Sequence, residues 1–557
     1  MHESIIRRSA LGLCLLVTMA LSSHVYATGE AVFNVKDYGA TGNKTDDARP
    51  AIQKAIDACA AAGGGVVYIP PGQYTSGTLH LRSHVRFRIE AGATLFASPD
   101  PNAYNPGGID SKAALLYGED VQDISIEGRG TVDGQSEYIW RPDDFERAFS
   151  HKIMMESLHK SLMRSFPKGF PDRTIYPHMV WLGRCKDVHI TGLTFLHSPS
   201  WTMALYACER MVIDGLYIYT SLKEAVWADG IDMDGCKDIR IANCSIETGD
   251  DCIIFISTDS WGPALLCENI TVTNCVLSSA SAAVKFSEGN KLGIRHIAID
   301  NCVIKNTNRG FVFTITTGGY INDVVISNLT IDLHRFEWFW DGDGQPFYFR
   351  ITRLSEWNRE PAQPGEAPPG SIRNVLIQNV IAHVQGESLI AGHPESWLDG
   401  VSIRNLKLFL STDPTAPYDT SVDALKFQWA KNLKLEDIEV NWEKPELKAW
   451  KSALAFEDVR GLEIEGFTGR QAWANGDAPA VAFNKVSDAV IRDSQAAAGT
   501  GAFLKVSGAT SHGIYLLGND LRKARIPFAV EKGVARGAVT TIDNFLSTEQ
   551  SHGQPSR

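Results

Sequence analysis

The chain has 557 residues, 44% of them hydrophobic, so it can bury a large core and is not an intrinsically disordered protein. Lys and Arg number 53 against 65 Asp and Glu, and the net charge of −12, without basic runs, argues against a general nucleic-acid binder. With 48 Gly and 24 Pro, the composition excludes collagen-like and low-complexity chains.

The N-terminus has the pattern of a secretory signal peptide. Arg7 and Arg8 form a positive start, an apolar stretch runs from Ala10 to Leu21, and Val25-Tyr26-Ala27 supplies a small-residue cleavage pattern. A membrane anchor is disfavoured, because the apolar stretch is shorter than the roughly 20 residues that cross a bilayer and no second one follows. We therefore expect residues 1–27 to be removed and the protein to be secreted or periplasmic.

The first predicted element after this leader is a helix over Ala48 to Ala62. Thr45-Asp46-Asp47 precedes it with N-cap chemistry, and Gly63-Gly64-Gly65 ends it. Val66 to Ile69 is predicted as the first strand. The helix is expected to cap the N-terminal end of a stack of strands, because an open stack exposes unpaired backbone.

One short pattern then returns along the chain: alternating β-branched or apolar residues, followed by Asn, Gly or Asp and usually by another apolar residue. Its centres are Gly192, Gly215, Asn243, Asn274, Asn301, Asn328, Asn379, Asn405, Asp437, Gly466, Asp493 and, more loosely, Gly518 or Asn519. Successive centres are mostly 23 to 32 residues apart, with one double-length gap between Asn328 and Asn379. Such a period marks a solenoid, and the period-2 alternation makes its units strands.

This repeat favours a parallel β-helix over a β-sandwich or a propeller, which do not repeat an Asn-then-apolar position at single-coil spacing. Coils would stack at about 4.8 Å, and the turn Asn side chains would form a hydrogen-bonded ladder. We expect one domain over residues 28–547, with insertions near 138–175 and 333–371, and a flexible tail over 548–557. The insertions, rich in aromatic residues, are expected either to wall a binding groove or to close over the core.

Nine cysteines follow the predicted leader. An odd number in so long a chain does not indicate a disulfide framework, and the absence of CxxC pairs argues against zinc. Several of them recur at one place in the repeat, as small buried apolar residues do, although one or two disulfides stay an open alternative.

Two aspartate motifs carry the candidate chemistry. Ala228-Asp229-Gly230-Ile231-Asp232 is followed one coil later by Gly249-Asp250-Asp251-Cys252, so Asp229 is expected to lie close to Asp250 and Asp251. Mutual repulsion should raise at least one carboxyl pKa, which gives the protonated acid and ionised base that glycoside hydrolysis needs. The alternative is a pair of ordinary turns, and the one-coil registration favours catalysis. Asp232 and Asp234, at period 2, are expected to be strand-edge or supporting residues.

With these motifs the sequence resembles glycoside hydrolase family 28, the polygalacturonase-like enzymes. The resemblance runs from about Phe33 to at least Asp332 and includes Phe33–Ala40, Thr131–Gln135 and His197–Trp201. It implies an all-β fold, a single-stranded right-handed parallel β-helix of the pectin-lyase-like kind with an N-terminal capping helix. It also implies inverting hydrolysis of a polysaccharide or oligosaccharide without cofactor or metal, with Asp250 as general acid and Asp229 and Asp251 holding and activating the water.

Two motifs of this family are absent. The Gly-His-Gly motif would fall near Ser281-Ala282-Ala283, and the Arg-Ile-Lys motif, which grips a galacturonate carboxylate, near Val312-Phe313-Thr314. Lys285, Glu288 and Arg309 lie close by and are expected to supply replacement substrate contacts, with Trp201 and Trp340 as aromatic ones; charges on a solvated face are the alternative. We expect a pectic or related substrate, with a neutral or differently linked sugar at the cleavage point and exo-action on short oligosaccharides.

Two rival interpretations remain. In a polysaccharide lyase, Lys285 or Arg309 would abstract a proton while the aspartates held Ca²⁺. In a carbohydrate-binding β-helix, the same face would hold a glycan without cleaving it.

Overall fold

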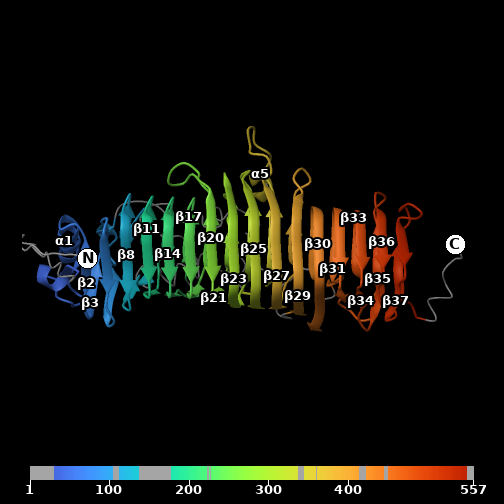
Figure 1. The fold of residues 1–557 in the computed structure, drawn as a ribbon, viewed down its shortest axis with the longest axis horizontal. Coiled ribbons are helices and arrows are strands. Elements are labelled where there is room, and N and C mark those ends of the chain that lie inside the picture. The colour runs from blue at the N-terminus through green and yellow to red at the C-terminus, as the bar shows by residue number, and fades with distance from the viewer. Residues whose placement is uncertain are drawn as a thin grey trace, which may run out of the picture.

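The computed structural model describes residues 30–104, 112–136, 177–222, 225, 227–336, 344–358, 360–412, 422–444 and 449–547. The chain winds into an elongated right-handed parallel β-helix whose coils follow one another from the N-terminal to the C-terminal end (Figure 1). The predicted leader, the insertion near 138–175, Trp340 and the predicted tail lie outside the described residues. No helix in the described parts is both long enough and apolar enough to cross a membrane.

Each coil contributes a strand to each of three sheets, and the strands pair in parallel with those of the next coil. Sheet 1 consists of the first parts of β30 (Leu425–Lys444), β31 (Leu454–Glu465) and β33 (Pro479–Arg492), with β4 (Leu79–His80), β7 (Ala114–Glu119), β10 (His178–Gly183), β13 (Met203–Tyr206), β16 (Ile231–Asp234), β19 (Ile253–Ile256), β22 (Ala282–Phe286), β24 (Arg309–Ile315), β26 (Gln345–Ile351), β28 (Ser388–Ala391), β35 (Thr500–Ser507) and β37 (Ala524–Val530).

Sheet 2 begins with short strands and continues with the first parts of longer ones. It contains β1 (Val32–Asn34), β2 (Gly65–Ile69), β5 (Val85–Ile89), β8 (Gln122–Gly128), β11 (Lys186–Thr191), β14 (Glu209–Asp214), β17 (Lys237–Ala242), β20 (Cys267–Thr273), β23 (Gly293–Thr307), β25 (Tyr320–Leu333), β27 (Ser371–Val384), β29 (Leu398–Ser411), later parts of β30, β31 and β33, β36 (His512–Leu517) and β38 (Val539–Ile542).

Sheet 3 consists of short separate strands and of the last parts of the longer strands that begin in sheet 2. Its separate strands are β3 (Gly72–Ser76), β6 (Ala93–Ala97), β9 (Thr131–Asp133), β12 (Thr194–Leu196), β15 (Tyr217–Tyr219), β18 (Ser245–Thr248), β21 (Val276–Ser279), β32 (Thr468–Gly469) and β34 (Gln495–Ala496). The turns that lead from sheet 3 into sheet 1 of the next coil, here called the 3–1 turns, carry the candidate site.

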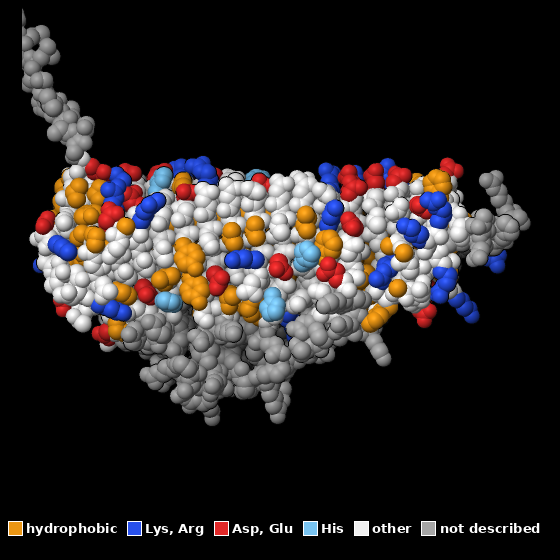
Figure 2. All heavy atoms as spheres, turned by 90° about the horizontal axis from the view of Figure 1, so that it is seen from below, with side chains coloured by type: hydrophobic (Ala, Val, Ile, Leu, Met, Phe, Trp, Pro, Cys, Tyr) orange, Lys and Arg blue, Asp and Glu red, His pale blue; other side chains and the backbone are white. Residues whose placement is uncertain are grey.

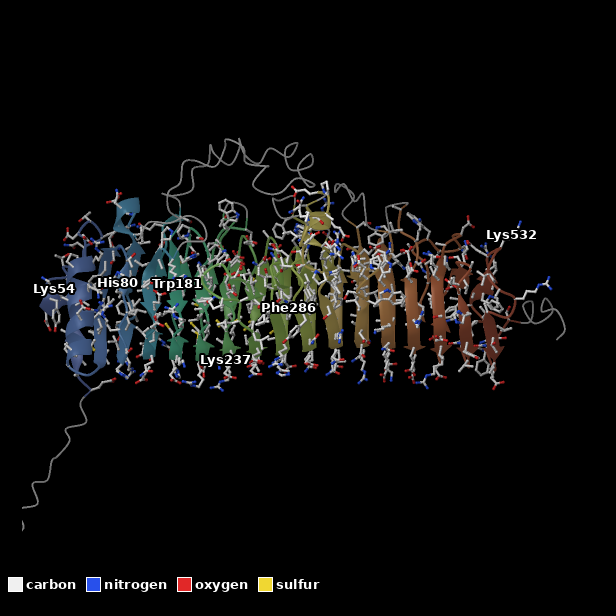
Figure 3. All side chains as sticks on the ribbon, turned by 90° about the horizontal axis from the view of Figure 1, so that it is seen from above. Lys54, His80, Trp181, Lys237, Phe286 and Lys532 are labelled. Carbon is white, nitrogen blue, oxygen red and sulfur yellow. The ribbon has the colours of Figure 1, made fainter. Side chains whose placement is uncertain are left out.

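The interior is filled by side chains of equivalent positions, stacked coil upon coil. Phe255, Phe286, Phe313 and Phe349 form one such column, with successive ring centroids 4.8, 4.0 and 4.0 Å apart, and Phe286 is labelled in Figure 3. Because strand residues alternate between faces, the neighbours of these residues point outward. The outer surface carries charged and apolar side chains interspersed along the stack (Figure 2).

The predicted repeat centres are the turn residues between sheets 2 and 3, and all adopt positive φ. The angle is 74° at Gly192, 54° at Asn301 and 62° at Gly518, which, rather than Asn519, occupies the last of the predicted turns. Only Gly, and less readily Asn and Asp, adopts this left-handed conformation at low cost, which explains the residue types of the repeat.

The predicted asparagine ladder is present. The side-chain amide of Asn301 donates to Oδ1 of Asn274 at 2.6 Å, and Asn405 donates to Asn379 at 3.0 Å. Asn379 donates to Oδ1 of Asn328 at 2.9 Å, so the double-length gap is one enlarged coil and not two coils.

The nine cysteines after the predicted leader are free and buried, so the alternative of one or two disulfides is wrong. Cys244, Cys275 and Cys302 directly follow the left-handed turn residues and share one position of the repeat. Cys185, Cys208 and Cys236 share a second position before sheet 2, linked through backbone bonds between neighbouring coils. The cysteines therefore act as small apolar fillers of the core.

The N-terminal end is covered by α1 (Arg49–Ala61), whose buried face includes Ile52, Ile56 and Cys59. Its N-cap is Ala48, without a side-chain cap bond, while Oδ1 of Asp47 accepts from the amide of Arg49 at 3.0 Å. β2 was expected to be the first strand, but β1 precedes it and pairs with it.

The stretch 333–371 is not wholly an insertion. β26 lies within it as a regular strand of sheet 1, and Phe347 on that strand is fully buried. The short helices η1 (Val35–Tyr38), η2 (Pro101–Ala103) and α5 (Leu354–Trp357) complete the described elements.

A pair of substitutions at Asn301 separates the two roles of a turn residue. Asn301→Gly removes the ladder bond but tolerates positive φ, so it should cost about 1 kcal/mol of unfolding free energy. Asn301→Ala also removes the ladder bond, and Ala adopts the left-handed region less readily than Asn or Gly, so it should cost about 2–3 kcal/mol. Urea denaturation followed by circular dichroism measures both, and equal losses would contradict the role of the backbone conformation.

Candidate active site

The three predicted aspartates lie in consecutive 3–1 turns. Asp229 precedes β16, and Asp250 and Asp251 precede β19 of the next coil. The backbone amide of Asp251 donates to Oδ1 of Asp229 at 3.1 Å, and the amide of Gly230 donates to the Asp251 carbonyl at 2.9 Å. The parallel register between two coils therefore brings the motifs together.

Glycines and hydroxyl groups hold these turns. A Cβ at Gly230 would lie 2.3 Å from the carbonyl oxygen of Cys252, so glycine allows the close approach of the two coils. The hydroxyls of Thr248 and Ser279 donate to the Asp250 carbonyl at 2.8 and 2.6 Å. These contacts fix the backbone from which the Asp250 side chain projects.

One carboxylate oxygen from each of Asp229, Asp250 and Asp251 lies within 4.8 Å of the other two. The three residues are buried, with at most 6% of their surface exposed. Burial, followed by repulsion from neighbouring carboxyls, raises the pKa of Asp229 and of Asp250 well above the usual range. The cluster therefore retains protons at a pH at which isolated aspartates are ionised, and it titrates as a unit.

Lys285 is the cation of this cluster. Its ammonium lies 3.2 Å from Oδ2 of Asp251 and 3.2 Å from Oε2 of Glu288. Burial alone would lower the pKa of Lys285, but the surrounding carboxylates outweigh it and raise that pKa well above its usual value. Oδ1 of Asp251 also accepts from the Ala282 amide at 2.8 Å, so both oxygens of Asp251 have donors, the pattern of an ionised carboxylate.

Asp232 was expected to be a supporting residue, and the structure gives it a larger part. Ile231 and Met233 point into the core, so Asp232 faces outward beside the cluster. It is fully buried, and neither carboxylate oxygen has a hydrogen-bond partner in the part of the chain that the structure describes. Burial and the charges of Asp251 and Asp250 raise its pKa well above the usual range. The alternation of apolar Ile231 and Met233 with Asp232 is the sequence signal that could have placed Asp232 on the outward face of β16.

Asp234, the other expected supporting residue, has that role. Its carboxylate accepts from the backbone amide and the hydroxyl of Thr258, at 2.8 and 2.5 Å. It therefore holds the loop after β19 against β16.

An aromatic group flanks the cluster on its N-terminal side. Trp181, Ala204 and Asp232 are in register on consecutive strands of sheet 1, so Trp181 lies two coils from Asp232. The Trp201 ring lies 5.7 Å from that of Trp261, which lies 5.9 Å from that of Trp181. Trp201, a predicted substrate contact, is thus part of an aromatic wall one coil before Asp229.

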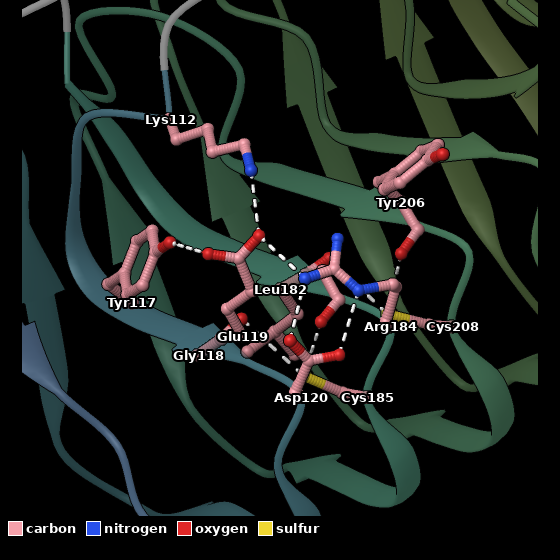
Figure 4. A network of polar contacts seen from close by, with 11 residues as sticks. Lys112, Tyr117, Gly118, Glu119, Asp120, Leu182, Arg184, Cys185, Tyr206 and Cys208 are labelled. Carbon is pink, nitrogen blue, oxygen red and sulfur yellow. Dashed lines mark hydrogen bonds and ion pairs between the residues drawn. The ribbon is translucent and has the colours of Figure 1, made fainter. Parts of the chain in front are cut away.

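A polar network supports this wall (Figure 4). Glu119 accepts from Lys112 at 2.7 Å and from Arg184 at 2.9 Å, and it also accepts the Tyr117 hydroxyl proton. The ring of Tyr117 stacks on Trp181 with centroids 5.0 Å apart. Lys112 and Arg184 are therefore neutralised by carboxylates.

The remaining predicted contacts lie on the C-terminal side. Glu288 is 38% exposed and pairs with Lys285. Nε of Arg309 donates to Oε1 of Gln345 at 3.1 Å, and its guanidinium lies 5.4 Å from the centroid of the Tyr348 ring. Within the described ranges Arg309 has no ion-pair partner. Tyr348 is one of the aromatic residues of the stretch 333–371 that was expected to wall a groove or close over the core, and it is in register with Lys285, which lies two coils before it.

Residues 59–333 match the sequence profile of "Glycosyl hydrolases family 28". The chain belongs to this family. The family-28 chain is similar to a probable polygalacturonase of Vitis vinifera, 26% identical over 333 residues that cover 55% of this chain and 62% of the relative. It is also similar to an exopolygalacturonase of Zea mays, 25% identical over 282 residues that cover 50% of this chain and 60% of the relative. The chain thus spans less than two thirds of the length of these relatives.

Solved structures show the same fold. An exopolygalacturonase from Thermotoga maritima aligns with a TM-score of 0.56 and 20% identity, covering 74% of this chain and 92% of that one. A family 28 exopolygalacturonase from Yersinia enterocolitica aligns with a TM-score of 0.57 and 19% identity, covering 78% of each chain. The predicted right-handed parallel β-helix is confirmed.

Replacing Lys285 tests the electrostatics of the cluster. Lys285 opposes the rise in the pKa of Asp229 and of Asp250, so Lys285→Met should raise both further. The acid is active when protonated and the base when ionised, so both limbs of the pH profile of kcat/KM should move to higher pH. We also expect kcat to fall by about tenfold or more.

The pH profile of glycan cleavage measures this shift. Lys237→Met, which removes an exposed lysine on β17 (Figure 3), is the matched control and should leave the profile in place. An unshifted profile in folded Lys285→Met protein would contradict the role of Lys285.

Proposed function

We propose that this family-28 chain is a glycoside hydrolase that cleaves glycosidic bonds in pectic or related plant-type polysaccharides or oligosaccharides. The observation that carries the proposal is the buried cluster of Asp229, Asp250 and Asp251, with Lys285 paired to Asp251. A protonated carboxyl beside an ionised one supplies the acid and the base of glycoside hydrolysis. The signal-peptide pattern supports export to the periplasm or the medium.

In the proposed reaction Asp250 protonates the glycosidic oxygen. Its raised pKa keeps the proton available, while Asp251 pairs with Lys285 and accepts from the Ala282 amide, the contacts proposed to suit it to the role of the base. Asp251 and Asp229 then hold and activate the water. Asp232 adds a carboxyl that favours retention of a proton in the cluster, because four buried negative charges so close together repel one another.

The stereochemistry follows from the resemblance rather than from the spacing. Inverting pairs typically stand about 6.5–9.5 Å apart and retaining pairs about 5–5.5 Å apart. The oxygens of this cluster lie within 4.8 Å of one another, closer than the usual inverting arrangement. The family resemblance supports inversion, and the configuration of the first product decides the question.

The substrate contacts favour a partly anionic glycan. Lys285 is already shared by two carboxylates, so Arg309 beside Tyr348 is the cation proposed to meet a uronate carboxylate. Trp201 is proposed to stack against a sugar face on the other side. Exo-action is proposed as well, and the exopolygalacturonases among the similar proteins support it.

The lyase alternative is weaker. A lyase base must be deprotonated, whereas the raised pKa of Lys285 keeps its ammonium charged. Three carboxylates could in principle hold Ca²⁺, but that ammonium 3.2 Å from Asp251 opposes a second cation there.

Asp250→Asn tests the proposed acid. Turnover of polygalacturonate or rhamnogalacturonan oligomers should fall by about 10³-fold or more, because the general acid is lost, while the circular dichroism spectrum stays unchanged. Asp123→Asn, at an exposed aspartate, is the control with unchanged turnover. Near-normal release of reducing sugar by Asp250→Asn would remove the assignment, and unsaturated products absorbing in the ultraviolet would favour a lyase.

Proton NMR of the first minutes of cleavage gives the stereochemistry and the mode of attack together. Inversion predicts that the anomer opposite to that of the scissile bond appears first, before mutarotation. Exo-action predicts that one small product accumulates from the start. Early retention, or an even ladder of oligomers, would overturn the corresponding part of the proposal.

A further inference from the structure

A cavity of about 590 Å³ lies near the N-terminal end, between the loop that leads into α1 and the first 3–1 turns. Its lining includes Lys44, Asp46, Arg49, Asp100 and Gln135. This volume falls within the range of about 300–1,000 Å³ that is usual for small-molecule sites. None of the lining residues belongs to the aspartate cluster.

The cavity and the cluster share one row of turns. Gln135 follows β9, and its Nε2 donates to the Ala97 carbonyl of the preceding coil at 2.5 Å. In the next coils, the Ser136 amide donates to the His197 carbonyl at 3.1 Å, and the His197 amide to the Tyr219 carbonyl at 2.9 Å. The cavity therefore lies three to five coils from Asp250, about 14–24 Å at the usual strand spacing.

Gln135, in the wall of this cavity, has an unsatisfied polar atom. The residue is 3% exposed, and its buried Oε1 has no hydrogen-bond partner among the described residues, although its Nε2 donates to Ala97. Leaving a buried acceptor unpaired costs about 1–3 kcal/mol, so a donor from a bound molecule or water is expected there. In the coil between the cavity and Asp229, the buried hydroxyls of Ser200 and Thr202 also have no partner in the described part of the chain.

The lining suits a polyhydroxylated ligand. The Lys44 ammonium lies 4.0 Å from the centroid of the Phe96 ring and has no ion-pair partner in the described residues. Arg49 donates to the Ala103 carbonyl at 3.3 Å, and the carboxylates of Asp46 and Asp100 stand nearby. Few apolar side chains line the cavity, which disfavours lipids. Cations and anions are mixed in its lining, which disfavours highly charged anions. This mixture favours ligands whose hydroxyl groups both donate and accept hydrogen bonds.

We propose that this cavity is a remote carbohydrate-binding site, which holds sugar units of the same glycan chain whose scissile bond lies at the aspartate cluster. A hydroxyl of the bound sugar donates to Oε1 of Gln135, and Lys44 donates to a sugar oxygen. The assignment of the glycan rests on the proposed function. A single monosaccharide cannot span the distance between the two sites, whereas an oligosaccharide can.

Chain-length kinetics test the proposal. Thr45→Trp fills the cavity from its exposed rim, and Lys44→Ala removes the cation. For galacturonate oligomers from the dimer to the octamer, kcat/KM of both variants should match the wild type on the shortest chains and fall by about tenfold on the longest. Lys54→Ala, at an exposed lysine on α1 outside the cavity (Figure 3), is the control. Equal effects on all chain lengths, or no effect, would overturn the proposal.

Binding without turnover separates this proposal from the proposed function. In isothermal titration calorimetry with the octamer, Asp250→Asn protein should bind, and the Thr45→Trp/Asp250→Asn double variant should bind about tenfold more weakly. Wild-type protein that binds the octamer in this Thr45-dependent way but cleaves no oligomer would overturn the proposed function and keep the remote site. No binding, or binding insensitive to Thr45→Trp, would overturn the remote site.

Discussion

The parallel register between neighbouring coils is the constraint on which the rest of the molecule depends. Each coil repeats the turn and strand positions of the one before, so residues far apart in the sequence meet at a fixed offset. The left-handed turn between sheets 2 and 3 keeps this register, since a Gly, Asn or Asp at each predicted turn lets the chain bend in the same way every time. The asparagine ladder then ties neighbouring turns together where both carry Asn, from Asn243 to Asn301 and from Asn328 to Asn405.

The same register concentrates charge at the site. Three aspartates from two turns and one from β16 meet in a buried volume, with Lys285 from a third coil as the partially compensating cation. Burying so many carboxyls is costly, and the backbone amides of Asp251 and Ala282 offset part of that cost by donating to them. The chain keeps this arrangement in spite of the cost, as is common where perturbed carboxyls carry chemistry.

Much of the fold could be predicted from the sequence because Gly, Asn and Asp recur at one position of the repeat, and these are the residues that adopt the left-handed conformation at low cost. Asn243, Asn274 and Asn301 predicted both the turn and the ladder. The spacing of Asp229 and Asp250 predicted that they lie close together. Asp232 was underestimated because an aspartate at period 2 on a strand edge is usually solvated, and its burial depends on the neighbouring coils. β26 was hidden inside an apparent insertion, since its coil lacks the usual spacing. The cavity near α1 could not be predicted, because its lining comes from several coils and from the loop before the helix.

The column of Cys185, Cys208 and Cys236, which continues to Cys267 in the next coil, has a consequence for the redox chemistry of the molecule. Burial raises the pKa of Cys208 and brings that of Cys267 to about 12, so the thiolate of these two residues, which is the form that reacts with oxidants and alkylating reagents, is scarce in the folded state. The thiols become reactive only when a coil separates from its neighbours. Their rate of labelling by an alkylating reagent therefore reports how often neighbouring coils in the middle of the solenoid separate.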